Sequence, residues 1–295
     1  MFTRQKYLLA YVQACEGKCS RLQLDKGLFW FCKNNPILSL YDFHPYSFGP
    51  FSETLYLDLR VLQDKEILFQ SEENIELRIP KDQGEKLVSG INENDKTTLK
   101  AIANDFSHLS FDQLLQKVYS AYPYYAINNP SFRNQYEIYD PRTFPKNQGA
   151  KIFSIGYEGV SIDEFINKLI QNNVQSLVDV RNNPRSMKFG FSEKKLKGIC
   201  ERHNIEYLSI RSLGIESEKR QELDTQDDYR KLFVDFEKNH MPNVKEELHK
   251  LRRMLEEGKR LALMCFEKDI HCCHREVVTR HLCQLCKGMY ELQHI

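Results

Sequence analysis

The chain has 295 residues, of which 41% are hydrophobic and 28% are charged. This is an ordinary composition for a globular protein, and the length is sufficient for two domains that each bury a core. The formal net charge of +1 excludes a global field that would draw the whole molecule onto nucleic acid or a membrane. No apolar run is long enough to cross a bilayer, and the first ten residues lack the pattern of a signal peptide. We therefore expect a cytoplasmic protein with no membrane partner.

The nine cysteines do not indicate a secreted disulfide scaffold. Their number is odd, which excludes complete internal pairing, and four of them fall between Cys272 and Cys286. Disulfide-rich secreted domains are usually much shorter than this chain. We expect most of these cysteines to be thiols or metal ligands.

The N-terminal residues predict a mostly helical domain over 1–127. Two amphipathic helical patterns occupy residues 4–32, with Ser20 as the expected N-cap of the second. An aromatic segment with many turn residues follows at 41–52, then a helix over 52–68 and an extended piece near 74–79. This order predicts a winged helix-turn-helix. We expect the aromatic side chains of 41–51 to pack in its core rather than to stack on bases.

Three segments carry a resemblance to known winged-helix families: R21-L-Q-L-D-K-G-L-F29, Y41-D-F-H-P-Y-S-F-G-P-F-S52 and L55-Y-L-D-L-R-V-L-Q-D-K-E-I-L68. They resemble the Panacea antitoxin-like and YwgA-like families, and Y119-S-A-Y-P-Y-Y125 is similar to the end of the same unit. The resemblance implies a domain that binds DNA or a protein partner. A fold alone does not select between these partners.

A change in composition separates this region from a second domain. Residues 128–150 contain prolines at 130, 141 and 145 and show little periodicity, which predicts a linker. Strands and helices then alternate over 151–295, with Ser161 and Glu164 at capping-box spacing. We expect strands at 152–155, 175–180, 205–209 and 261–266, and helices through 165–170, at 192–203, at 244–257 and after the last strand. This pattern predicts an α/β domain with a parallel sheet and helices on both faces.

Polar side chains follow three of the predicted strands. The segments are G156-Y-E-G159, D179-V-R-N-N-P-R-S186 and C265-F-E-K-D-I-H-C-C-H-R275. Ligands of open parallel sheets collect beyond the carboxyl ends of the strands. We therefore expect one crevice lined by Tyr157, Asp179, Arg181, Cys265, Glu267 and Arg275.

These segments also resemble a widespread family, the domain of unknown function 488. The matching residues are S154-I-G156, D179-V-R-N-N-P-R-S186, I205-E-Y207, L213-G214, C265-F-E267 and C273-H-R275, spread over nearly all of 151–290. The sequence departs from the family at 213–215, where Ile215 stands in place of a frequent second glycine. The resemblance implies an α/β fold and these site positions, but it implies no established reaction.

The candidate site residues fall into two roles. We expect Asp179, Glu267 and Cys265 to be catalytic, and we expect substrate binding by Tyr157, Arg181, Arg185, Ser186, His274 and Arg275. Each has a plainer interpretation. Asp179 could pair with Arg181, Glu267 could pair with Arg275, and Cys265 could be a small buried apolar residue. Loop arginines beside a strand end nevertheless suit phosphate or carboxylate groups.

Metal binding is a further alternative. Cys265, Cys272, Cys273 and His274 are soft ligands that suit zinc. The pair C283-Q-L-C286 adds a C-x-x-C spacing, but it lies in a helical pattern, so we expect one helix face with one buried cysteine. Zinc is therefore the minority interpretation of this cluster.

Three functional hypotheses remain. The first is an enzyme acting on nucleic acid, by base excision or strand hydrolysis in genome defence or repair, with the winged helix as its targeting module. The second is a rhodanese-like or phosphatase-like thiol enzyme, although Cys265 lies too far before Arg275, and Cys272 and Cys273 too close, for one tight anion loop. The third is a non-enzymatic DNA-binding regulator or antitoxin-like sensor. We favour the first, a hydrolase or glycosylase that acts on DNA.

Overall fold

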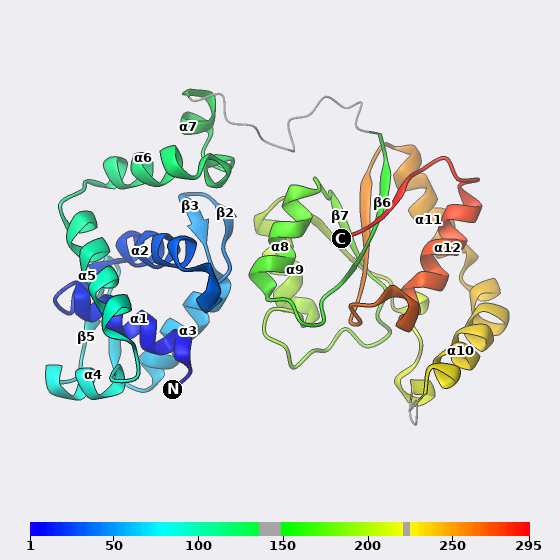
Figure 1. Ribbon diagram of the computed structural model, residues 1–295. Helices are drawn as coiled ribbons and strands as arrows, with labels where there is room; N and C mark the ends of the chain where they lie inside the picture. The colour runs from blue at the N-terminus through cyan, green and yellow to red at the C-terminus, as the bar shows by residue number, and fades with distance from the viewer. Residues whose placement is uncertain (136–148, 221–224) are drawn as a thin grey trace. The chain divides into compact units, whose positions relative to one another are not determined.

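The computed structural model describes residues 1–135, 149–220 and 225–295. The chain divides into two compact units, Met1–Asp140 and Pro141–Ile295, and each is considered by itself (Figure 1). Part of the predicted linker, 136–148, lies outside the described residues, while Pro130–Gln135 forms helix α7. Within the described ranges, no helix is both long enough and apolar enough to cross a membrane.

The N-terminal unit is mostly helical with small antiparallel sheets, which confirms the predicted fold class. Its other helices are α1 Thr3–Ala14, α2 Arg21–Asn34, α3 Glu53–Asp64, α4 Lys81–Leu87, α5 Glu93–Ser107 and α6 Phe111–Ala121. Strands β1 Lys18–Ser20, β4 Leu68–Gln70 and β5 Asn74–Leu77 form an antiparallel sheet in the order β1-β5-β4. Strands β2 His44–Tyr46 and β3 Gly49–Phe51 form a separate antiparallel pair.

Local signals in the sequence account for several of these elements. The Ser20 side chain accepts a hydrogen bond from the backbone N–H of Gln23, so it caps α2 as predicted. The predicted helix over 52–68 is shorter, because Glu66 adopts a left-handed φ of 56° that ends α3 and turns the chain into β4. Tyr41 and Phe43 are buried in the core as expected, whereas Phe48 is exposed.

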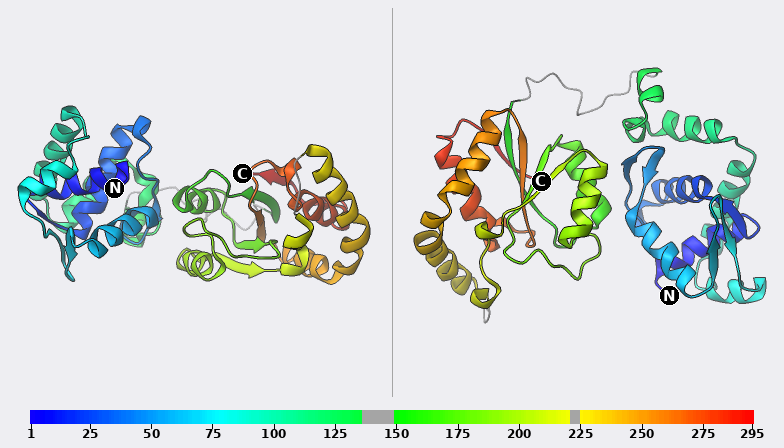
Figure 2. Two further views of the ribbon diagram at one scale, coloured as in Figure 1. Left: turned by 90° about the horizontal axis from the view of Figure 1, so that it is seen from below. Right: turned by 180° about the vertical axis from the view of Figure 1, so that it is seen from behind.

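The C-terminal unit is built on a five-stranded parallel sheet. Its strands are β6 Lys151–Gly156, β7 Ser176–Asp179, β8 Glu206–Ser209, β9 Arg260–Cys265 and β10 Leu292–His294, in the order β10-β6-β9-β7-β8. Its α-helices are α8 Ile162–Gln171, α9 Glu193–Arg202, α10 Gln226–Asp235, α11 Lys245–Glu256 and α12 Arg275–Leu285. Helices α8 and α9 cover one face of the sheet, and α11 and α12 cover the other (Figures 1 and 2). The predicted parallel sheet with helices on both faces is confirmed.

The connections diverge at the centre of this sheet. Neighbouring strands β6 and β9 are followed by α8 and α12, which lie on opposite faces (Figure 1). In open parallel sheets, such a switch leaves a crevice outside the carboxyl ends of the two strands. The fold therefore puts the end of β9, with Cys265, beside the end of β6 at the position where ligands usually bind.

Candidate functional site

Strand pairing brings the three predicted polar segments to one edge of the sheet. Gly156 at the end of β6 is in register with Cys265 at the end of β9, and Asp179 at the end of β7 is in register with Met264. The residues that follow these strands consequently lie close together. They form two adjoining clusters rather than one open ring of side chains.

The first cluster is a buried ion pair between Asp179 and Arg181. The Arg181 side chain donates from Nε to Oδ1 of Asp179 at 2.8 Å and from Nη2 to Oδ2 at 2.5 Å. The Tyr207 hydroxyl donates to the same Oδ2 at 2.6 Å, and Asp179 is completely buried. Its two carboxylate oxygens are thus engaged by the protein itself.

Two further hydrogen bonds hold the Arg181 guanidinium within the protein. Nη1 donates to the Tyr157 hydroxyl at 2.8 Å, and Nη2 donates to the Phe191 carbonyl at 3.0 Å. Burial alone would lower the pKa of Arg181, but Asp179 and Tyr157 raise it above its usual value. This geometry matches the plainer interpretation of Asp179 and Arg181, in which each serves as the partner of the other.

The second cluster contains two thiols and an imidazole. Cys265 Sγ lies 3.7 Å from His274 Nδ1, and the ligand atoms of Cys265, Cys273 and His274 all lie within 4.8 Å of one another. All three side chains are buried. The pKa of the Cys273 thiol lies well above its usual range. Burial is the largest cause, and the neighbouring Cys265 raises this pKa further.

A backbone carbonyl fixes the orientation of the His274 ring. Its Nε2 lies 3.0 Å from the carbonyl oxygen of Val180, directly after β7. A carbonyl can only accept, so this contact requires the hydrogen on Nε2. In the neutral ring, Nδ1 then presents its lone pair toward Cys265.

Glu267 and Arg275 complete this region. One carboxylate oxygen of the half-buried Glu267 lies 3.4 Å from Cys265 Sγ. Arg275 contacts the backbone of the same loop. Its guanidinium donates to Ser154 Oγ at 2.9 Å, to the Lys268 carbonyl at 3.0 Å and to the Glu267 carbonyl. Arg275 therefore ties the loop after β9 to strand β6, and it is buried while doing so.

Tyr157 joins the two clusters. Its backbone N–H donates to the Phe266 carbonyl at 3.0 Å, and its ring meets the Phe266 ring edge-on with centroids 5.2 Å apart. On its other side it stacks on Phe191 at 4.3 Å. All six residues expected in the crevice thus belong to adjoining clusters at one edge.

Other candidates lie apart from these clusters. Arg185 is exposed and Ser186 is half-buried, both on the loop after β7. Cys272 is half-buried beside Asp269, at 3.9 Å from Sγ to Oδ2, and does not belong to the compact group of Cys265, Cys273 and His274. In α12 and its C-cap, Cys286 is buried and Cys283 is half-buried, as the helical pattern predicts.

The sequence interpretation missed Tyr207 and Phe191 as parts of the site. Tyr207 stands in the I205-E-Y207 motif, and burial together with Asp179 raises its pKa above the usual value. Phe191 follows Gly190, which has a left-handed φ of 90°. The motif was therefore a usable signal for Tyr207, whereas only the folded loop shows the role of Phe191.

At two motif positions, a residue larger than glycine would clash with the backbone of a neighbouring loop. A Cβ at position 156 would overlap the backbone carbonyl of Glu267, and a Cβ at position 214 would overlap the backbone of Asn182. Each glycine thus lets a strand end or turn touch a loop of the site. Ile215, where the family often has another glycine, is buried in the core.

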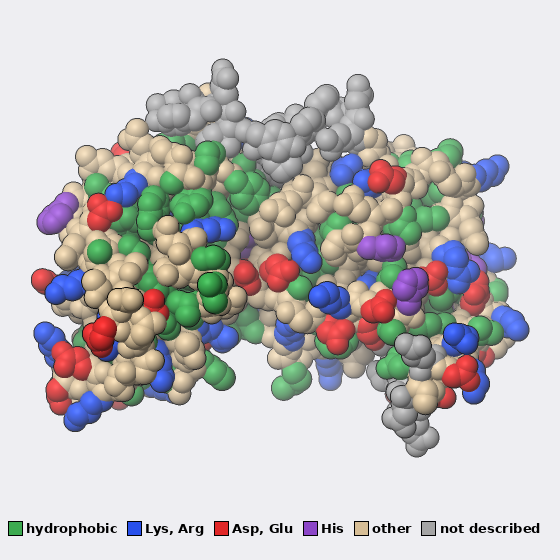
Figure 3. Space-filling model, viewed as in Figure 1, with side chains coloured by type: hydrophobic (Ala, Val, Ile, Leu, Met, Phe, Trp, Pro, Cys, Tyr) green, Lys and Arg blue, Asp and Glu red, His purple; other side chains and the backbone are tan. Residues whose placement is uncertain are grey.

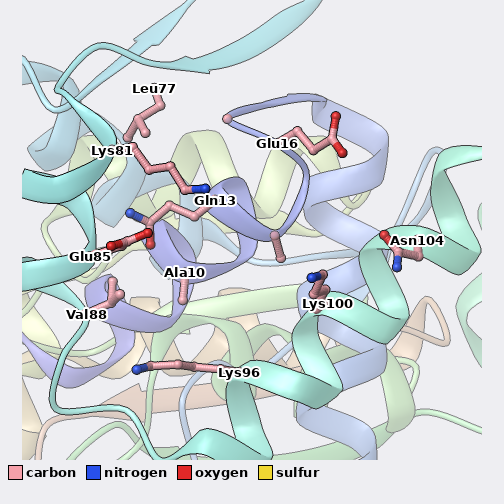
Figure 4. A pocket seen from close by; sticks show the side chains of 12 residues that line it. Ala10, Gln13, Glu16, Leu77, Lys81, Glu85, Val88, Lys96, Lys100 and Asn104 are labelled. Carbon is pink, nitrogen blue, oxygen red and sulfur yellow. The ribbon is translucent and has the colours of Figure 1, made fainter.

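A separate pocket of about 790 Å³ lies in the N-terminal unit (Figure 4). Basic side chains from α4 and α5 share its lining with acidic ones and with apolar residues of α1. None of the predicted site residues contributes to it. The charged residues of its lining are Glu16, Lys81, Glu85, Lys96 and Lys100.

Comparison with known proteins agrees with the C-terminal geometry. Residues 161–282 match the family model described as Domain of unknown function DUF488. This match spans β7, β8 and β9 and most of α12, and so covers both clusters of the site. No curated protein and no solved structure matches the chain. The C-terminal unit thus contains a DUF488 domain.

Proposed function

We propose that this protein is a nucleic-acid-directed enzyme, a hydrolase or glycosylase that acts on DNA in genome defence or repair. In this proposal the catalytic edge is the carboxyl edge of the five-stranded sheet. The observation that carries it is the surface around this edge, where the exposed apolar side chains of Met187 and Phe266 accompany the exposed cation Arg185.

The loop over 181–190 provides most of this surface. It contains no acidic residue, and its cations are the exposed Arg185, the half-buried Lys188 and Arg181, which is buried in the ion pair with Asp179. Met187 at its tip is fully exposed, and Phe266, next to Glu267, is 42% exposed. Cations suit phosphates, while exposed aromatic and apolar side chains can stack on bases or hold an unstacked step open. Both features favour a nucleotide lifted from its stack as the substrate.

Glu267 is the best-placed acid or base in this proposal. Asp179 is engaged by Arg181 and Tyr207, whereas Glu267 is half-buried at the exposed end of the cluster. A partly buried carboxylate can activate water or stabilise a sugar cation.

The N-terminal unit is proposed as a winged-helix targeting module. Its basis is the element order α1-β1-α2-β2-β3-α3-β4-β5, in which β1, β5 and β4 form one antiparallel sheet. Residues 1–140 contain 15 Lys and Arg against 18 Asp and Glu, and the turn between β4 and β5 carries Glu72 and Glu73. This acidic balance favours a protein partner for the N-terminal unit and leaves the nucleic acid to the C-terminal unit.

The test uses the full chain at low salt with labelled single-stranded and double-stranded DNA, including duplexes with modified bases. We expect binding, followed by abasic sites or strand breaks on denaturing gels. Glu267→Gln should bind as the wild type does and lose turnover. Specific operator binding without turnover would instead identify a regulator, and no binding at low salt would end the proposal.

A thiol enzyme is the second candidate, because Cys265 Sγ lies 3.7 Å from His274 Nδ1. A histidine at this position can accept the thiol proton. Under this alternative, iodoacetamide labels Cys265 faster than the similarly buried Cys200, and Cys265→Ser abolishes turnover. Equal labelling rates would remove the candidate.

A further inference from the structure

We propose that Cys265, Cys273 and His274 bind one zinc ion and leave its fourth position open beside Glu267. The binding itself is independent of the proposed function. Only the use of this ion as a catalytic metal rests on that function.

The distances within the group suit tetrahedral coordination. Zinc lies about 2.3 Å from a thiolate and about 2.0–2.1 Å from an imidazole nitrogen, so a tetrahedral angle separates the two ligand atoms by about 3.6 Å. The observed separation of Cys265 Sγ and His274 Nδ1 is 3.7 Å. Cys273 Sγ lies within 4.8 Å of both. Little movement is needed to close the three ligands around an ion.

The ring of His274 is oriented as a metal ligand requires. Metal-binding histidines usually donate their second N–H to a carbonyl or carboxylate, which fixes the tautomer. Here Nε2 meets the Val180 carbonyl at 3.0 Å and Nδ1 faces the thiols. The outer contact comes from Val180, directly after β7, whereas the ligands come from the end of β9 and from the two residues directly before α12.

The donor set selects zinc among the common divalent ions. Two thiols and an imidazole are soft ligands, which magnesium and calcium do not prefer. When Zn²⁺ replaces the two thiol protons, which pass to the buffer, the two thiolates balance its charge. The neutral unit costs far less to bury than a bare ion would in this buried cluster.

The fourth position opens toward Glu267. Its carboxylate lies 3.4 Å from Cys265 Sγ but does not belong to the compact group of three ligands, and it is half-buried while they are buried. Three protein ligands with one open position are typical of catalytic zinc. Two cysteines and a histidine, with a glutamate that is not a ligand, also serve the zinc enzymes that deaminate nucleobases. The site thus fits a water, or an atom of a base, at the open position.

The direct test is the zinc content of the full chain, measured by mass spectrometry after purification under reducing conditions. We expect about one zinc per chain for the wild type. Cys265→Ser and Cys273→Ser should lose it. Cys272→Ser is the matched control, since it removes the adjacent cysteine outside the group, and it should keep its zinc. Circular dichroism identifies variants that fail to fold.

Cobalt provides a readout on the folded wild-type chain. Co²⁺ added to metal-free protein should give the thiolate-to-cobalt absorption and the visible bands of a tetrahedral site, and both should be absent from Cys273→Ser. Glu267→Gln should retain these bands and the zinc. Loss of zinc in Glu267→Gln would make Glu267 a ligand and would overturn the open position.

Three further results would overturn the proposed metal site. A wild-type chain that takes up neither zinc nor cobalt in the reduced state overturns the site, as does equal metal loss in Cys272→Ser. Thiol counting on the denatured chain would reveal a disulfide between Cys265 and Cys273, which would also overturn it. A zinc-bound chain without action on nucleic acid supports the metal site and contradicts the proposed function, so the two failures are distinguishable.

Discussion

At the scale of single residues, the ion pair of Asp179 and Arg181 has a testable structural role. The pair is buried, so removal of one charge leaves the other buried without an opposite charge beside it. We expect Asp179→Asn to destabilise the C-terminal unit by about 3–5 kcal/mol. Urea unfolding followed by circular dichroism measures this loss. The fluorescence of Trp30, the single tryptophan, reports the N-terminal unit and should not change. Unchanged stability with abolished turnover would instead make Asp179 a catalytic residue.

Gly156 gives a second prediction at this scale, because its backbone touches that of Glu267. In Gly156→Ala the added methyl group must push the loop after β9 away from β6. We expect weaker zinc binding and faster hydrogen exchange of the amides at 266–268. Gly198→Ala is the control, since a Cβ there meets no atom within 4 Å. The same loss in both variants would show that the close approach is not the cause.

At the scale of elements, helix α2 buries two adjacent charged residues and should make the N-terminal unit sensitive to pH. Burial raises the pKa of Asp25 from 3.8 to about 6, although Lys26 and the Tyr56 hydroxyl oppose the shift. Between pH 4 and 6 the unfolded chain has lost this proton while the folded chain keeps it. Stability therefore falls as the pH rises through this window, by up to about 1.4 kcal/mol per pH unit, and then levels off.

Asp25→Asn should remove this slope, because asparagine can still accept the hydrogen bond from Tyr56. Urea unfolding of both proteins at pH 4.5, 5.5 and 6.5, followed by Trp30 fluorescence, measures the difference. The variant should gain stability relative to the wild type as the pH rises. Parallel pH profiles for the two proteins would contradict the assignment.

The elements also show what could be read from the sequence. The central strands were predictable because apolar runs such as 261–266 are buried on both faces of the sheet. Strand β10 was not, since its three residues have no apolar pattern and are defined by pairing with β6. The convergence of Asp179 and Cys265 followed from the rule for strand ends. Their division into an ion pair and a thiol cluster depends on side-chain packing, which a single sequence does not encode locally.

At the scale of the whole molecule, charge is distributed rather than concentrated. Lys and Arg number 42 and Asp and Glu 41, and side chains of both signs are interspersed on the face shown in Figure 3. Such a surface provides no broad electrostatic attraction for nucleic acid. Under the proposed function, the affinity for DNA should therefore come from a few phosphate contacts on the loop over 181–190 and should show a shallow salt dependence.

Arg185 offers the clearest test of this expectation, because its side chain is exposed on the loop after β7. If it binds one phosphate, Arg185→Ala should reduce the slope of log K against log salt by about 1, with affinity lowered uniformly across DNA sequences. Lys250→Ala, which removes an exposed cation from α11, should leave the slope unchanged. Titrations of labelled DNA at several salt concentrations measure both. Removing an ion contact reduces the number of counterions that are released when DNA binds. Equal slopes for Arg185→Ala and the wild type would therefore mean that the phosphates lie elsewhere.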